Sequence, residues 1–322
     1  MHLLHDLQDR LADGESVVCT IGVFDGVHLG HREVIATVQR SAAELGVASA
    51  VVTFDGHPAH VVRPDSAPPL LTTLDQKLEL LEDLGVDYVY LVHFDHQRAR
   101  TGAEEFARQV FAESLHARRI VVGEDFHFGR GREGDVAALR RFGAAMGFEV
   151  VALPLVPRRD GDPEPVSSTA IRRALAAGDV EAAAAMLGRW FSVRGRVVEG
   201  DRRGRTIGFP TANLPVPTVM AWPADGVYAG WCTRTDGSRW PCAVNIGRRP
   251  TFHTDADHRV LEAHLCGFDG DLYGEQIEVA FVARLRDEKR FDGVDELVAQ
   301  LTRDVAAVRE RLGVAAGPEA KN

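Results

Sequence analysis

Two histidines three residues apart, His28 and His31, close the string Thr20-Ile-Gly-Val-Phe-Asp-Gly-Val-His-Leu-Gly-His31. The string follows an apolar run and precedes a helical pattern, and Gly22 and Gly26 let the backbone approach a ligand closely. Amide groups at the start of a helix favour an anion, and two imidazoles on one side of the first turn can stabilise charge on a phosphoryl group. A tight turn followed by two surface histidines is the alternative.

Two further strings in the first half place polar and aromatic groups beside predicted element ends. Ser167-Ser-Thr-Ala-Ile-Arg172 precedes an alanine-rich helix, so its hydroxyls suit a helix cap and its guanidinium group suits a phosphate. Val122-Gly-Glu-Asp-Phe-His-Phe-Gly129 follows a predicted strand. There Phe128, with Phe54 at another strand end, can stack on an aromatic ligand, and Asp125 can hydrogen-bond it. Taken singly, an ordinary helix start, core packing and a turn explain these residues.

A glycine- and arginine-rich string opens the second half and ends in Pro210-Thr-Ala-Asn213. It predicts a mobile loop that closes over a polyphosphate, with a solvated hairpin as the alternative. The hydroxyl and amide oxygens at its end suit Mg²⁺ shared with phosphate oxygens. No GxxxxGK[ST] motif occurs, which excludes P-loop kinase chemistry. The loop combines three glycines with three arginines: Gly200, Arg202, Arg203, Gly204, Arg205 and Gly208.

One carboxylate interrupts a later apolar run, Val260-Leu-Glu-Ala-His-Leu265. Strand alternation either turns Glu262 outward or holds it for proton transfer, and the run by itself leaves both open.

The elements that must position these residues differ between the two halves. From Ser16 to Val156, short β-branched runs alternate with patterns of helical period, which predicts βαβ units, a mostly parallel sheet and ligands beyond the carboxyl ends of the strands. From Phe191 to Arg284, brief apolar runs and many glycines predict a small antiparallel barrel or sandwich. Val294–Leu312 predicts an amphipathic capping helix. Three Asp-Gly pairs predict tight hairpins, at Asp225–Gly226, Asp236–Gly237 and Asp269–Gly270.

In this order, the strings resemble the prokaryotic bifunctional FAD synthetase family, also called riboflavin kinase/FMN adenylyltransferase. The first string resembles the HxGH signature of nucleotidyltransferases, and Pro210–Asn213 resembles the PTAN motif of riboflavin kinases. The likeness covers residues 16–312. It continues through Gly226-Val-Tyr-Ala229, Asn245-Ile-Gly247, Pro250-Thr-Phe252, Leu261-Glu-Ala263, Asp271-Leu-Tyr-Gly274 and Lys289-Arg-Phe-Asp292.

The resemblance implies an α/β fold with two domains. Residues 1–187 form a Rossmann-like, parallel-sheet nucleotidyltransferase domain, and residues 188–322 form a small antiparallel β-barrel riboflavin kinase domain with a C-terminal helix. One ATP phosphorylates riboflavin to FMN, and a second adenylylates FMN to FAD and releases pyrophosphate.

The resemblance also assigns roles to residues. Glu262 accepts the proton of the ribityl hydroxyl, while His28, His31 and Arg172 stabilise the α-phosphate. Thr211 contacts Mg²⁺. The residues assigned to ATP are Gly22, Phe24, Asp25, Gly26, Ser168, Thr169, Gly204, Thr211 and Asn213. Those assigned to the flavin are Phe54, Asp125, Phe128, Arg290 and Phe291.

Composition limits the classes of partner. The 322 residues include 37 basic and 47 acidic side chains, and the net charge of -10 argues against non-specific nucleic-acid binding. No run of eighteen apolar residues and no signal peptide are visible, and four scattered cysteines without a CxxC pair suggest neither disulfides nor zinc. We therefore expect a cytoplasmic protein whose partners are small molecules. Oligomeric state is not readable.

Three other functions remain open from the sequence. One domain could have lost its activity and serve as a flavin-holding scaffold, or the whole chain could be a flavin or nucleotide sensor without turnover. Adenylyl or cytidylyl transfer to a different phosphate acceptor is the third. The kinase-like second half disfavours that last alternative.

Overall fold

Alternating strands and helices form the first of two compact units, residues 1–168 and 169–322, in a computed structural model. The structure describes residues 1–158, 161, 163–200, 203–215, 217–249 and 258–314. The elements of the first unit are β1 (His2–His5), β2 (Val17–Ile21), α1 (Leu29–Leu45), β3 (Ala48–Phe54), α2 (Pro58–Val62), η1 (Pro64–Ser66), α3 (Leu74–Asp83), β4 (Tyr88–Val92), η2 (Arg98–Arg100), α4 (Ala103–Phe106), η3 (Ala107–Ser114), β5 (Ala117–Gly123), η4 (Arg130–Arg132), α5 (Val136–Met146) and β6 (Glu149–Leu153).

The first unit contains a six-stranded sheet in the order β1-β4-β3-β2-β5-β6, and all its pairings are parallel. The predicted parallel α/β fold is therefore confirmed. Strand β1 was missed, because an exposed edge strand carries little hydrophobic signal. Chain order reverses at β2, which lies between β3 and β5, so the string after β2 leaves the sheet at its switch point.

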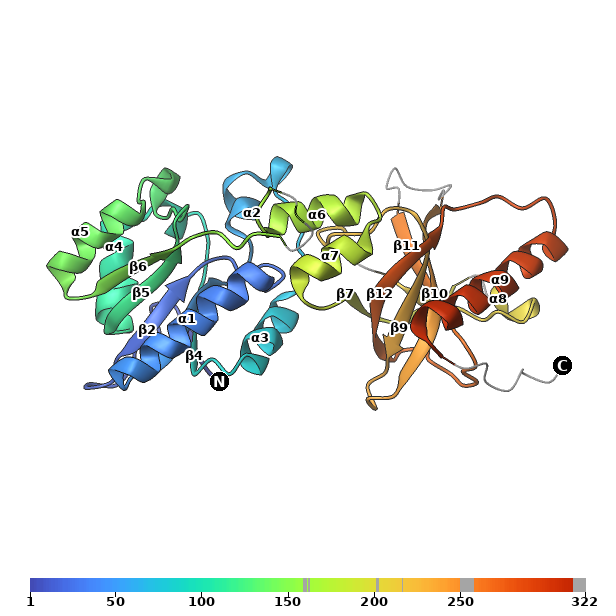
Figure 1. Ribbon diagram of the computed structural model, residues 1–322, viewed down its shortest axis with the longest axis horizontal. Helices are drawn as coiled ribbons and strands as arrows, with labels where there is room; N and C mark the ends of the chain where they lie inside the picture. The colour runs from blue at the N-terminus through green and yellow to red at the C-terminus, as the bar shows by residue number, and fades with distance from the viewer. Residues whose placement is uncertain (159–160, 162, 201–202, 216, 250–257, 315–322) are drawn as a thin grey trace. The chain divides into compact units, whose positions relative to one another are not determined.

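Helices cover both faces of this sheet (Figure 1). On one face Phe111 of η3 and Leu139 of α5 pack with inward residues of the central strands. On the other face Ile35 of α1 and Leu81 of α3 pack with Val51 of β3. Burial on both faces explains why β2 reads as a continuous apolar run instead of an alternating one.

The second unit begins with two helices and continues as an antiparallel sheet in the order β7-β12-β9-β10-β11-β8. An isolated antiparallel bridge from Val198, just after β7, to Asn213 in β8 joins the two ends of the sheet. The predicted small barrel is thus a curled sheet. Its elements are α6 (Ser168–Ala176), α7 (Val180–Leu187), β7 (Phe191–Arg196), α8 (Arg203–Thr206), β8 (Ala212–Leu214), β9 (Gly226–Thr233), β10 (Arg239–Arg249), β11 (His258–Leu265), β12 (Gln276–Arg286) and α9 (Val294–Leu312).

Only one of the three Asp-Gly pairs forms the predicted tight hairpin. Asp236–Gly237 joins β9 to β10, and Gly237 has a φ of 81°. Asp225–Gly226 instead leads into β9, and Asp269–Gly270 lies within the longer connection from β11 to β12. The dipeptide preference is local, whereas the length of a connection is set by which strands must pair.

Helix α9 has the predicted bounds and packs on the sheet through Val305 and Val308. Not every residue of its apolar stripe is covered, because Val294 is 59% exposed. A buried acid, Asp304, also anchors the helix: its carboxylate accepts bonds from Arg286 Nε at 2.9 Å and Nη2 at 2.7 Å. The helical period did not predict this ion pair.

We expect Asp304→Ala to lower the free energy of unfolding of the second unit by about 2–3 kcal/mol, because Arg286 loses its buried partner. All four tryptophans, Trp190, Trp222, Trp231 and Trp240, lie in this unit, so their fluorescence during urea unfolding reports on it specifically. Glu310→Ala, on an exposed position of the same helix, is the matched control. Equal midpoints for the two variants would contradict an anchoring role.

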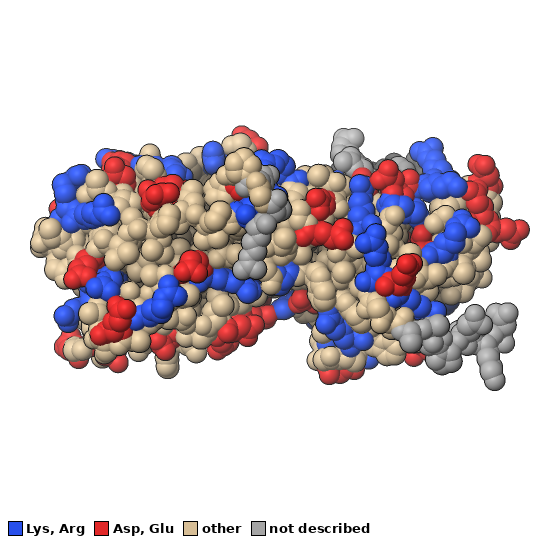
Figure 2. Space-filling model, in the orientation of Figure 1, with Lys and Arg blue, Asp and Glu red and all other residues tan. Residues whose placement is uncertain are grey.

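Basic and acidic side chains are intermixed over the visible face of each unit (Figure 2), without a broad basic surface on that face. All four cysteines are buried and unpaired. None of the helices in the described part of the chain is long and apolar enough to cross a membrane.

Candidate active sites

A cavity of about 740 Å³ opens in the second unit and brings together several residues that the sequence singled out. Gly204, Thr211, Asn213, Glu262 and Phe291 all contribute to its lining. Arg290 is exposed and is not among the lining residues. Of the two neighbouring residues assigned to the flavin in this unit, the structure therefore places only Phe291 at the cavity.

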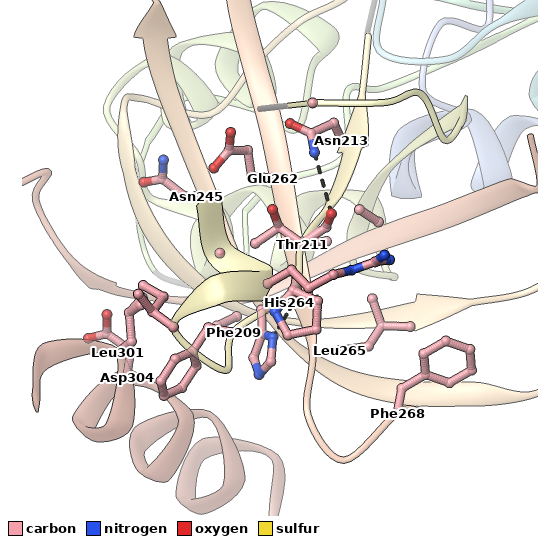
Figure 3. Close-up of a pocket in the computed structure, with 18 of the residues that line it drawn as sticks. Phe209, Thr211, Asn213, Asn245, Glu262, His264, Leu265, Phe268, Leu301 and Asp304 are labelled. Atoms are coloured by element: carbon pink, nitrogen blue, oxygen red, sulfur yellow. Dashed lines mark hydrogen bonds between the residues drawn. The ribbon is translucent and has the colours of Figure 1, made fainter. Parts of the chain in front are cut away.

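Strand register explains why Glu262 lies beside the PTAN string. On one side Glu262 of β11 is paired with Asn213 of β8, and on the other with Asn245 of β10. Its neighbours Leu261 and Ala263 are fully buried, whereas Glu262 is half-buried and faces the cavity. Figure 3 shows these three polar side chains grouped together above Thr211. Strand alternation left two orientations open for Glu262, outward or toward a site, and in the structure its side chain faces the cavity.

The PTAN loop is fixed from within. Asn213 is buried, and its side-chain nitrogen donates to the Thr211 carbonyl at 3.4 Å, which orients the amide (Figure 3). A Cβ on Gly200 would lie 2.6 Å from Asn213 Nδ2, and one on Gly204 would overlap the carbonyl oxygen of Phe209. These glycines therefore serve close packing around the loop.

Part of the arginine-rich string is helical, not a hairpin. Residues Arg203–Thr206 form α8. Arg205 lines the cavity together with Arg286 and Lys289, which gives this acidic protein a local set of cations for anionic phosphates. Arg202 and the Pro250–Phe252 string lie outside the described residues.

His264 is a cavity residue to which the sequence gave no role. Since a carbonyl oxygen only accepts, its Nδ1 donates to the Pro210 carbonyl at 2.8 Å, and its ring packs on Phe209 at 5.3 Å between centroids. Burial lowers the pKa of the imidazole, which keeps it neutral. His264 thus links β11 to the first residue of the PTAN string.

Asn245 and Glu288 were also missed as individual residues, although Asn245 belongs to one of the matching strings. The Asn245 amide hydrogen-bonds the Glu288 carboxylate, which packs against Gly247. Burial, with the charges of Asp225 and Glu262, raises the pKa of Glu288. The pairing of β10 with β11 places Asn245 beside Glu262, and the Asn245 amide in turn bonds Glu288, which follows β12.

In the first unit, His28 is the N-cap of α1 and is buried. Its Nδ1 accepts the His31 backbone N–H at 3.3 Å, and the two imidazoles stack with centroids 3.5 Å apart and planes at 19°. His31 also contacts the Phe24 ring at 4.9 Å. The predicted pairing of the histidines on one side of the first turn is confirmed, in the form of a stacked pair at a helix N-terminus.

The loop before α1 has an unusual backbone. Phe24 and Val27 have φ values of 51° and 39°, which are rare for bulky and β-branched residues, and Gly26 has a φ of 84°. Asp25 is buried, and its carboxylate accepts the Leu71 amide at 2.9 Å. Its predicted contact with ATP therefore competes with a structural role. A Cβ on Gly22 would lie 3.1 Å from the Phe24 ring.

Ser168 approaches the same loop, because its hydroxyl donates to the Asp25 carbonyl at 2.9 Å. Thr169 and Arg172 follow on α6 and belong to the second compact unit.

The predicted flavin residues of the first unit belong largely to its core. Phe128 is buried and stacks on Phe126 with centroids 5.3 Å apart, while Phe54 packs edge-on against Phe94. Asp125 is exposed. Core packing accounts for Phe128, and flavin contact remains a prediction for all three assigned residues.

Among the described residues, no group of three or more His, Cys, Asp or Glu side chains could hold a metal. Oxygen donors such as the Thr211 hydroxyl and Asn213 amide, shared with phosphate oxygens, fit a hard cation that uses few protein ligands.

Comparison with known proteins identifies a family for each half of the chain. A family model described as FAD synthetase matches residues 11–170, and one described as riboflavin kinase matches residues 187–312. These ranges leave 171–186 outside both models, and the domain boundary after residue 187 stays a prediction.

Three relatives and one solved structure cover nearly the whole chain. Bifunctional riboflavin kinase/FMN adenylyltransferases of Escherichia coli strain K12, Pseudomonas fluorescens and Bacillus subtilis are 39%, 38% and 34% identical, over 97%, 96% and 94% of this chain and 97%, 97% and 95% of their own. The crystal structure of a macrolide-efflux protein from Streptococcus pneumoniae superposes with a TM-score of 0.85 and 31% identity, over 96% of this chain and 99% of its own. With both family models matched in the order that the sequence motifs predict, the chain belongs to the bifunctional riboflavin kinase/FMN adenylyltransferase family.

Proposed function

We propose that this chain carries out both reactions of its family, phosphorylation of riboflavin in the second unit and adenylylation of FMN in the first. The observation that carries the kinase assignment is the cross-strand pairing of Glu262 with Asn213 in a cavity that Thr211 also lines. No P-loop is needed for such a site, because phosphoryl transfer depends mainly on positioning and charge neutralisation.

In the kinase step, Glu262 accepts the proton of the riboflavin 5′-hydroxyl. The hydroxyl oxygen of riboflavin attacks the γ-phosphorus of ATP, and the bond between that phosphorus and the ADP oxygen breaks. Asn245 and Asn213 are paired with Glu262 on its two sides, and they restrict the conformations of its side chain. Arg205 and Lys289 supply positive charge at the wall of the same cavity. The Thr211 hydroxyl and the Asn213 amide would hold Mg²⁺, which neutralises phosphate charge when bound.

In the adenylylation step, an FMN phosphate oxygen attacks the α-phosphorus of ATP and pyrophosphate leaves. His28 and His31, at the N-terminus of α1, stabilise the negative charge that develops on the α-phosphoryl oxygens. Gly22, Phe24 and Gly26 would place backbone beside the nucleotide. The resemblance assigns Arg172 to the same phosphates, and that role remains a prediction from the sequence.

Separating the two reactions tests the proposal directly. The full chain is incubated with Mg-ATP and either riboflavin or FMN, and the flavins are resolved by chromatography. We expect FMN and FAD from riboflavin and FAD from FMN. FMN alone from riboflavin would indicate one live activity, and no product would indicate a sensor without turnover.

Thr211→Val is expected to raise the Mg²⁺ concentration that gives half-maximal kinase activity by about tenfold, the equivalent of one lost polar contact. Adenylylation of FMN in the same preparation should keep its Mg²⁺ dependence. Thr302→Val, on an exposed position of α9, is the matched control. An unchanged Mg²⁺ dependence of the kinase would remove the Thr211 hydroxyl from the metal site.

A further inference from the structure

The loop that carries the two histidines is held from one side by residues Leu71–Lys77, which lead into α3 and lie in none of the motifs above. The Asp25 carboxylate accepts the backbone amides of Leu71 and Thr72, at 2.9 and 3.1 Å. In the opposite direction, the Gly26 amide donates to Thr72 Oγ1 at 3.2 Å. Both contacts are buried, so the loop and this segment are joined away from water.

Lys77 adds a third contact from the first turn of α3. Its side chain is buried, and Nζ donates to the carbonyl oxygens of Phe54 at 2.7 Å and Val23 at 3.3 Å. Nζ also donates to Thr53 Oγ1 at 3.3 Å, and that hydroxyl donates in turn to the Val23 carbonyl at 3.1 Å. The ammonium group thus lies where β2 and β3 end, directly before the histidine loop.

Global stability does not explain a buried charge at this position. Burial lowers the pKa of Lys77 to about 8, against the opposing influence of Asp25 and Asp55, so the ammonium form is disfavoured by its surroundings. Replacing a whole buried ion pair by apolar side chains of similar volume is often neutral or stabilising, so a buried charge is weak evidence of a contribution to global stability. A local role is better supported, because Phe24 and Val27 have backbone conformations that persist only where neighbouring contacts fix them.

We propose that Lys77 is a positioning residue for adenylyl transfer, which fixes the end of β2 and the loop after it so that His28 and His31 meet the α-phosphate. The inference rests on the proposed role of the histidines. Within the part of the chain that the structure describes, Lys77 Nζ donates to two backbone carbonyls and to Thr53 Oγ1, so its effect on the reaction passes through the loop.

The experiment uses the full chain with Lys77→Met, which keeps an unbranched side chain one atom shorter than lysine and removes its donors. We expect kcat for FMN adenylylation to fall about 10- to 100-fold with little change in the KM for ATP, because misplaced catalytic groups weaken the transition state more than substrate binding. Riboflavin phosphorylation by the second unit should be unchanged. Asp83→Asn, an exposed change at the end of the same helix, should keep both activities.

A double-mutant cycle with His31→Ala separates positioning from simple loss of folded protein. If Lys77 acts through the histidine loop, Lys77→Met should cost less than about threefold more in the His31→Ala background. Loss of folded protein would cost the same factor in both backgrounds, and that result would overturn the proposal, as would an unchanged kcat in Lys77→Met. If His31→Ala itself retains full adenylylation, the histidine role fails as well.

If circular dichroism shows that Lys77→Met unfolds the first unit, Thr72→Val is used to test the same contacts. It removes the hydroxyl that accepts the Gly26 amide and keeps the shape of the side chain. We expect a several-fold loss of kcat with the same lack of additivity against His31→Ala. Full activity of folded Thr72→Val, or an additive loss, would overturn the proposal.

Discussion

Glu262→Gln should abolish riboflavin phosphorylation, with a loss of about 10³-fold in kcat, and leave FMN adenylylation within about twofold of wild type. Glutamine keeps the shape of the side chain and its place between Asn213 and Asn245, but it cannot accept the hydroxyl proton. The two activities are measured on one preparation, with riboflavin or FMN as substrate and chromatography of the products.

The selectivity of this loss is the informative part. Because His28 and His31, to which adenylylation is assigned, lie in the other compact unit, that activity in the same tube reports that the variant protein is present and active. Glu310→Gln repeats the chemical change on an exposed face of α9 and should keep both activities. Equal loss of both reactions in folded Glu262→Gln would contradict the division into two sites, and full kinase activity would exclude Glu262 as the base.

Glu288 could act as a substitute base in Glu262→Gln, and this can be tested. Its carboxylate has a raised pKa, for which burial is the main cause, and it lies on the Asn245 side of Glu262. A neighbouring carboxylate can take over part of a lost base function when it is within reach of the same hydroxyl. Residual kinase activity in Glu262→Gln that disappears in the double variant with Glu288→Gln would identify that substitute base.

Local strings predicted the candidate catalytic groups, and the structure shows why they predicted little of what holds those groups in place. His28 and His31 are three residues apart, so helix geometry alone places them together. Glu262 and Asn213 are far apart in sequence, yet the predicted antiparallel barrel made their meeting possible, and the register of β8 and β11 realises it. The spacing of residues along a helix and the alternation along a strand each have a fixed period, which a single sequence displays.

The supporting residues have no such period. Lys77 reaches Val23 and Phe54, and Asp304 reaches Arg286, through contacts that depend on which elements pack against one another. Asp25 illustrates the resulting error in emphasis. It belongs to the string that is predicted to bind a nucleotide, but its carboxylate accepts the amides of Leu71 and Thr72. A buried polar group must find partners, and the sequence does not state where they are.

His31→Ala is expected to reduce FMN adenylylation by about 10²- to 10³-fold and to leave riboflavin phosphorylation unchanged, because one preorganised donor to a developing charge is typically worth about 3–4 kcal/mol. The substitution removes the ring that stacks on His28 but keeps the His31 backbone amide, which is the donor that caps α1. The helix start should therefore survive.

Kinetics with FMN and ATP varied separately distinguish the two possible roles of the ring. A loss confined to kcat and kcat/KM assigns the imidazole to the transition state, whereas a rise in the KM for ATP alone assigns it to substrate binding. His127→Ala, an exposed histidine in the same unit, is the matched control and should keep both activities. Wild-type adenylylation in folded His31→Ala would show that the stacked pair at α1 is structural, and the search for the phosphate-binding groups of this unit would then move to Ser168 and the backbone of the loop it contacts.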